Sequence, residues 1–112
     1  MRSWASANQE TVVRYIQAYV EGLRWAKNKA NKAEAAALLV KRLKMGPDVA
    51  GQCYDILADP GGGFAPDARL DMEGFGNVLK LRAEIEGQWG GTPPAAEKYL
   101  DLSYYTRALS GL

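Results

Sequence analysis

The stretch from Asn8 to Lys27 reads NQETVVRYIQAYVEGLRWAK, and it decides the fold expected for the whole chain. Apolar side chains recur in it at helical spacing, at Val12, Ile16, Val20 and Leu23. Such spacing places these side chains on one side of a long amphipathic helix. The apolar stripe is wide enough to need covering on more than one side, so we expect the later helices to pack against it.

Composition narrows the classes of protein to which this chain belongs. Of its 112 residues 47% are apolar and 24% are charged, which is typical of a folded domain and not of a disordered chain. Fourteen basic and thirteen acidic residues leave a net charge of +1. This balance provides no broad positive field for nucleic acid or for anionic lipid, so neither is an expected partner. No run approaches the roughly 20 apolar residues of a membrane span, so membrane insertion is not expected either.

The sequence offers few side chains for catalysis or for metal binding. It contains no histidine and a single cysteine, Cys53, which excludes an intramolecular disulfide and a Cys-His site within this chain. We predict that Cys53 is a small buried apolar residue. Paired carboxylates occur at Glu84 and Glu86 and at Glu97 and Asp101, but a solvated helix face explains them. We therefore predict no enzyme activity, no catalytic or metal-binding residue and no cofactor.

Shorter helices are predicted after the long one. Residues 1–112 are expected to form a single all-α domain or fragment of four to five helices arranged like a bundle. The predicted helices span residues 8–27, 31–44, 47–59 and 71–87, with short ones at 95–100 and 103–110.

Helix starts are marked by capping residues and by proline. Asn31 with Glu34 resembles a capping box, Pro47 suits a first helical turn, and Asp71 suits a helix N-cap. Residues 2–7 are expected to be an entry segment in front of the long helix. The expected core lines of the later helices are Ala36, Leu39, Val40 and Leu43; Val49, Cys53, Ile56 and Leu57; and Val78, Leu81 and Ile85 beside Phe75 and Leu79.

Two local patterns suggest phosphate binding but have simpler explanations. The run Gly61 to Gly63 is followed by no Lys-Ser or Lys-Thr, so a flexible loop explains it better than a phosphate loop. Lys41, Arg42 and Lys44 lie in a last helical turn, where the helix dipole favours cations.

Two phrases in the second half of the chain carry a family resemblance. Residues 70–84 read LDMEGFGNVLKLRAE and residues 93–105 read PPAAEKYLDLSYY. They closely resemble the C-terminal part of the periplasmic solute-binding proteins of NMT1/THI5-like, or sulfonate/nitrate/taurine-type, ABC importers. Residues 8–26 are similar to the helix that follows the second hinge crossing in that family. Residues 28–35 agree as well, although Lys29 stands where the family usually has proline.

The resemblance implies a role in solute uptake. In that family a small organic or anionic solute, such as a sulfonate, nitrate, taurine or a pyrimidine-like compound, binds in a cleft between two α/β lobes. The intact protein is periplasmic and delivers its solute to an ABC permease. This chain would be its C-terminal helical part and would mostly cover the first lobe. It would therefore not bind the solute alone.

The resemblance nominates few ligand-binding residues. Arg2 and Trp4 lie nearest the presumed hinge and are the cleft-proximal candidates, although packing is the simpler role for Trp4. Residues 1–8 lack the apolar core of an export signal, so no compartment is assigned to the chain itself. The chain opens almost directly into the long helix, which leads us to expect an excised piece. Without the lobes, we expect the uncovered apolar stripe to drive self-association.

A second function class is kept open. In this alternative the chain is a free-standing helical module that binds a partner protein through the exposed part of its apolar stripes. The DNA upstream of Met1 discriminates the two hypotheses, because only the first requires it to encode two α/β lobes.

Overall fold

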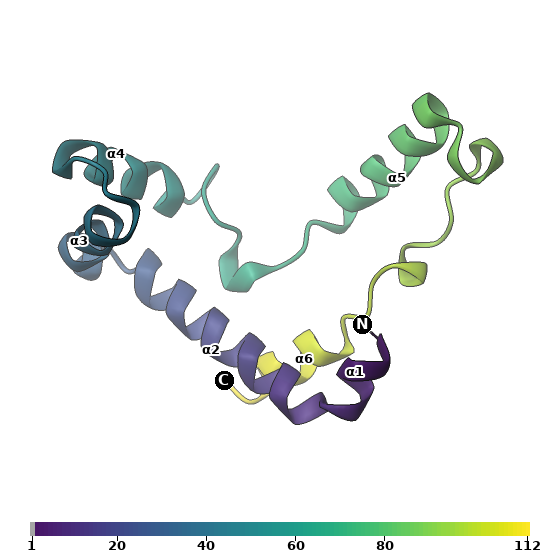
Figure 1. Ribbon diagram of the computed structural model, residues 1–112, viewed down its shortest axis with the longest axis horizontal. Coiled ribbons are helices and arrows are strands. Elements are labelled where there is room, and N and C mark those ends of the chain that lie inside the picture. Colours follow the sequence, from purple (N-terminus) through teal and green to yellow (C-terminus); the bar gives the residue numbers. More distant parts are fainter. Residues whose placement is uncertain (1) are drawn as a thin grey trace. The chain divides into compact units, whose positions relative to one another are not determined.

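Helices make up most of the chain in the computed structural model, which describes residues 2–112 (Figure 1). The α-helices are α1 (Arg2–Ala7), α2 (Gln9–Lys27), α3 (Lys32–Leu43), α4 (Pro47–Ala58), α5 (Met72–Glu86) and α6 (Ser103–Ser110). Short 3-10 turns occur at η1 (Lys29–Asn31), η2 (Pro66–Ala68), η3 (Gln88–Gly91) and η4 (Ala96–Lys98). No strand occurs within residues 2–112, and the predicted all-α class is confirmed.

The helices divide into two units along the chain. The first unit runs to Arg69 and contains α1 to α4 with η1 and η2, and the second runs from Leu70 to Leu112 and contains α5, η3, η4 and α6. Each unit is described below by itself. The single domain expected over residues 1–112 stays a prediction.

Helix α2 has nearly the bounds that its apolar spacing predicts. Its buried residues are Val13 and Val20, while Ile16 and Leu23 are half-buried. Val20 thus lies at the centre of the predicted stripe and is fully buried, and the other stripe residues are partly buried. The preceding entry segment is also helical, as α1, and the Asn8 side-chain amide donates to the Trp4 carbonyl oxygen at 2.9 Å.

Helices α3 and α4 lie side by side in the first unit (Figure 1). Lys44 adopts left-handed backbone (φ 57°), and its N–H donates to the Val40 carbonyl oxygen, which ends α3. After Gly46 in extended backbone, Pro47 opens α4, as its fixed φ predicts. The three residues 44–46 therefore connect the two helices.

The capping box predicted at Asn31 is wrong. The Asn31 side chain makes no capping bond to α3, and its amide instead donates to the Trp25 carbonyl oxygen at 2.9 Å. This bond ties the start of α3 to the last turn of α2. Asn28 caps the intervening turn, where its side-chain oxygen accepts from the Ala30 N–H at 3.0 Å.

Helix α4 buries a different line from the predicted one. Its buried residues are Ala50 and Tyr54, one helical turn apart, whereas Val49 and Ile56 are 51% and 67% exposed. Cys53 lies on the exposed line at helical spacing from both and is half-buried, so the prediction of a fully buried thiol is wrong. On α3 the same displacement occurs, because Ala35 is buried while Leu43 is exposed.

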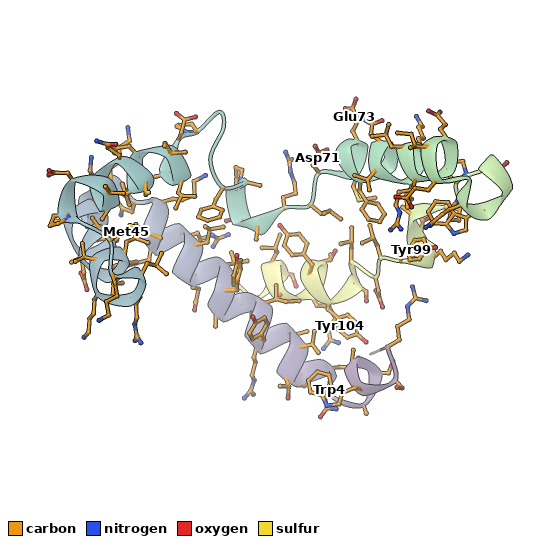
Figure 2. The ribbon with its side chains drawn as sticks, turned by 45° about the horizontal axis from the view of Figure 1, so that its top comes forward. Trp4, Met45, Asp71, Glu73, Tyr99 and Tyr104 are labelled. Atoms are coloured by element: carbon orange, nitrogen blue, oxygen red, sulfur yellow. The ribbon has the colours of Figure 1, made fainter. Side chains whose placement is uncertain are left out.

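Helix α5 begins as predicted but also presents an unexpected face. The Asp71 carboxylate accepts from the Gly74 N–H at 3.0 Å, which confirms the predicted N-cap; Figure 2 shows Asp71 at this end. Leu79 and Ala83 are the buried residues. The predicted core residues Val78, Leu81 and Ile85 are exposed to solvent over half or more of their surface.

The second unit ends in α6. The Asp101 carboxylate accepts from the Ser103 N–H at 3.0 Å and from the Ser103 hydroxyl at 2.6 Å, which supports the predicted start of this helix. Ala108 is its buried residue. Between α5 and α6, Gly87 in left-handed backbone ends α5 by donating its N–H to the Arg82 carbonyl oxygen.

Candidate functional site

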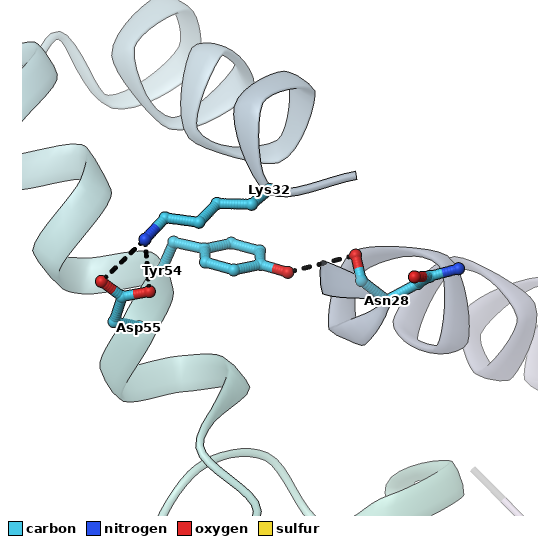
Figure 3. Close-up of polar contacts among 4 residues, drawn as sticks. All are labelled: Asn28, Lys32, Tyr54 and Asp55. Atoms are coloured by element: carbon cyan, nitrogen blue, oxygen red, sulfur yellow. Dashed lines mark hydrogen bonds and ion pairs between the residues drawn. The ribbon is translucent and has the colours of Figure 1, made fainter. Parts of the chain in front are cut away.

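Tyr54 is the centre of the best-connected group of side chains in the first unit. Its side chain is only 5% exposed, and its hydroxyl donates to the Asn28 carbonyl oxygen at 3.3 Å (Figure 3). Asn28 is the residue at which α2 ends. One side chain of α4 therefore reaches the C-terminal end of α2.

A cation and a carboxylate lie beside the Tyr54 ring. The Lys32 ammonium donates to both Asp55 carboxylate oxygens, at 2.6 and 2.9 Å, and lies 5.9 Å from the Tyr54 ring centroid (Figure 3). That distance is within the range of a cation–π contact. The side chains of Lys32 and Asp55 are about half exposed, so solvent screens this pair and its contribution to stability is about 0.2–1 kcal/mol.

Tyr54 lines two hollows. The first, here called the apolar groove, has a volume of about 210 Å³. It is lined by Trp25, Ala26, Lys27, Ala35, Leu38, Leu39, Tyr54, Leu57, Ala58 and Phe64. An apolar cavity of about 150 Å³ holds benzene, so the groove accommodates one bulky apolar side chain or a small apolar molecule. It is smaller than the roughly 300–1,000 Å³ of most ligand pockets.

The second hollow, here called the polar hollow, measures about 380 Å³. It is lined by Lys29, Lys32, Tyr54, Asp55, Ala58, Asp59 and Pro60. Its cations and carboxylates are exposed side chains, and the Lys32–Asp55 pair neutralises its own charge. In residues 2–112, no three His, Cys, Asp or Glu side chains come together as a metal site. Of the two hollows, the apolar groove suits an apolar group.

A second ion pair connects α2 to η2 within the first unit. Arg24 donates from Nε and from a terminal guanidinium nitrogen to the two Asp67 carboxylate oxygens, at 2.7 and 3.0 Å. The hydrogen bond from Arg24 is the main cause that lowers the pKa of Asp67 below its ordinary value; desolvation opposes it, and the guanidinium charge adds to the lowering. Both side chains are partly exposed.

The two residues that the sequence analysis predicts to lie near a ligand cleft are not in these two hollows. Arg2 and Trp4 are on α1, and neither lines the apolar groove or the polar hollow. Trp4 is 58% exposed (Figure 2), so packing within its own unit does not account for its ring. Their assignment to a ligand cleft stays a prediction.

Sequence reasoning missed Tyr54 and Phe64, which line the groove. Tyr54 follows Ala50 by four residues, and this helical spacing places the two side chains on one line of α4, the line that is buried. Phe64 lies in a Gly- and Pro-containing segment with no periodicity, so no pattern marked it.

Comparison of the chain with protein-family models, with curated proteins and with solved structures finds no match. Among residues 2–112, no helix combines the length and the apolar character needed to cross a membrane.

Proposed function

We propose that this chain is the C-terminal helical part of a periplasmic solute-binding protein that serves an ABC importer of the sulfonate/nitrate/taurine type. In this proposal its helices cover an α/β body, and the solute binds in a cleft that the body forms. The proposal rests on the resemblance of residues 8–35, 70–84 and 93–105 to that family. The observation that carries it further is the apolar line that α5 leaves in solvent.

This line consists of Val78, Leu81 and Ile85, which are 51%, 52% and 78% exposed. Full burial of such a side chain is worth about 1.5–3 kcal/mol, so covering the exposed part of all three recovers about 3–5 kcal/mol. That is a large share of the roughly 5–15 kcal/mol by which a domain is stable. A helix with one buried and one exposed apolar line is suited to lie between two layers.

Helix α4 repeats the pattern in the first unit. Ala50 and Tyr54 are buried on one line, while Val49 and Ile56 are exposed on another. Helices of both units thus each have an apolar line available for a further layer. In the proposed function that layer is the α/β body, and the chain alone binds neither solute nor permease.

The competing proposal is a free-standing helical module that uses the same exposed lines to bind a partner protein. The coding DNA upstream of Met1 separates the two. The first proposal expects it to encode two α/β lobes behind an export signal, in frame or in a split neighbouring gene. Unrelated upstream sequence behind a separate ribosome-binding site favours the module.

The experiment is co-expression of the chain with that encoded body, followed by co-purification. Ile85→Asp places a charge on the exposed α5 line and is expected to weaken co-purification at least tenfold, because the charge would be buried without a partner. Glu84→Gln, on the same helix and also exposed, is the matched control and is expected to leave it unchanged. Equal co-purification of both variants contradicts the assignment of this face.

Without the α/β body, the exposed apolar lines of α4 and α5 are expected to associate with a second copy of the chain. Sedimentation velocity at micromolar concentration should then show concentration-dependent assembly, and Ile85→Asp should reduce it. A monomer over the whole concentration range contradicts this expectation.

A further inference from the structure

The segment from Asp59 to Arg69, here called the strap, follows α4 and has a defined conformation. The Asp59 carboxylate accepts from the N–H groups of Gly61 and Gly62 at 2.9 and 2.7 Å, and the Gly63 N–H donates to the Asp59 carbonyl oxygen at 3.0 Å. A Cβ atom at Gly63 would lie 2.3 Å from the Leu57 carbonyl oxygen. Only glycine fits so close to the end of α4.

Two side chains of α2 hold the strap. Arg24 forms the bidentate pair with Asp67, and the Lys27 ammonium donates to the Phe64 carbonyl oxygen. Arg24 and Lys27 are three residues apart and hence on the same side of the helix. A planar guanidinium that meets a carboxylate through two hydrogen bonds also fixes the orientation of its partner. We call the Arg24–Asp67 pair the latch.

The strap is strained at the latch. Asp67 and Ala68 both have left-handed backbone, with φ of 52° and 56°, which non-glycine residues adopt rarely. Such backbone persists where surrounding contacts hold it. The latch therefore holds Asp67 and Ala68 in a conformation that their backbone disfavours. Loss of the latch removes this contact.

The strap also forms a wall of the apolar groove. Phe64 lines the groove together with Trp25 from α2, Leu38 from α3 and Leu57 from α4. Movement of the strap away from α2 removes Phe64 from this wall and uncovers apolar surface on three helices.

We propose that the strap is a latched wall of the apolar groove, which Arg24–Asp67 holds in place and which moves away from α2 when this pair is broken. Because the two side chains are 47% and 37% exposed, salt ions and an incoming carboxylate have access to them. Exposure of the apolar lining of the groove is thereby controlled by an ion pair at the surface. This inference concerns the first unit alone and does not depend on the proposed function.

The test is amide hydrogen exchange of the full chain with Asp67→Asn. The reporters are the N–H groups of Gly63, Phe64, Ala68 and Arg69, which are bonded within the strap or to the end of α4. An exposed ion pair of this kind is expected to speed their exchange about two- to fivefold, while the α4 amides around Tyr54 exchange as before. An uncharged apolar dye such as Nile red, which the freed Arg24 cation does not attract, should bind more strongly by a similar factor.

The matched control is Arg82→Gln, which breaks the exposed Arg82–Glu86 pair of α5 and leaves the strap untouched. It is expected to change neither strap exchange nor dye binding. Three results overturn the proposal: unchanged strap exchange in Asp67→Asn, equal acceleration of the strap and α4 amides, or faster strap exchange without increased dye binding.

Discussion

Replacement of Tyr54 by alanine is expected to be the most damaging single change in the first unit. The residue is 5% exposed and lines both the apolar groove and the polar hollow. Truncation of a buried aromatic ring typically costs about 3–5 kcal/mol, from lost burial and from the cavity left behind. Because the two hollows flank this ring, the cavity would join them and the surroundings could collapse little. We therefore expect the upper half of that range.

Tyr54→Phe separates the contribution of the hydroxyl from that of the ring. The hydroxyl donates to the Asn28 carbonyl oxygen at 3.3 Å, at the long end for such a bond, and Asn28 is exposed to water. We expect this variant to cost about 0.5–1 kcal/mol, since water replaces the lost partner. Tyr15→Ala, at a tyrosine that is 71% exposed on α2, is the matched control and should change stability by less than about 0.5 kcal/mol.

The assay is urea unfolding of each variant, followed by circular dichroism at 222 nm. A lower midpoint at unchanged slope reports the loss of stability. A cost below about 1 kcal/mol for Tyr54→Ala would refute the reasoning, because it would mean that this ring is not an element of the packed structure.

Three further predictions concern single polar contacts. Asp55→Asn breaks the exposed pair with Lys32 and should lower the free energy of unfolding in urea by about 0.2–1 kcal/mol. This difference from wild type should shrink in 1 M NaCl, because salt screens exposed charges. An equal difference at high salt would contradict the exposed pairing. Because Arg24 lowers the pKa of folded Asp67, the pair should stabilise the fold above the ordinary carboxyl pKa of 3.8 and lose this effect as the pH falls through the lowered value. The difference in free energy of unfolding between wild type and Asp67→Asn should therefore be constant near neutral pH and vanish in acid. A difference that grows in acid would contradict the lowered pKa. Asp71→Ala removes the N-cap of α5 and should cost about 0.5–2 kcal/mol in urea unfolding, whereas an unchanged midpoint would mean that the cap bond to Gly74 contributes nothing.

The sequence predicts the helices well because their signals are local. The long helix follows from apolar spacing, Pro47 marks the start of α4, and Asp71 marks the start of α5, each within one residue of the structure. These features depend on residues within a turn or two of each other. They need no knowledge of what packs against the helix.

The sequence does not predict which apolar line of a helix is buried. Both lines of α5 have helical spacing, and the choice of Leu79 over Val78 depends on neighbouring elements. The contacts that build the candidate site likewise join residues that are far apart in the sequence. Tyr54 meets a residue 26 positions away, and Arg24 one 43 positions away. Asn31 fails as a cap because its amide bonds to Trp25 instead.

The proposed function requires that this chain completes a solute-binding protein and does not bind solute alone. Isothermal titration calorimetry with taurine, an alkanesulfonate, nitrate and a pyrimidine tests it most directly, on the chain alone and on the chain assembled with the upstream-encoded body. The chain alone provides at most one side of a cleft, which cannot surround a small ligand, so we predict no saturable heat for it. For the chain assembled with the body, we predict a saturable isotherm with one of these solutes. A saturable micromolar isotherm from the chain alone, or none from a stable assembly, would contradict it.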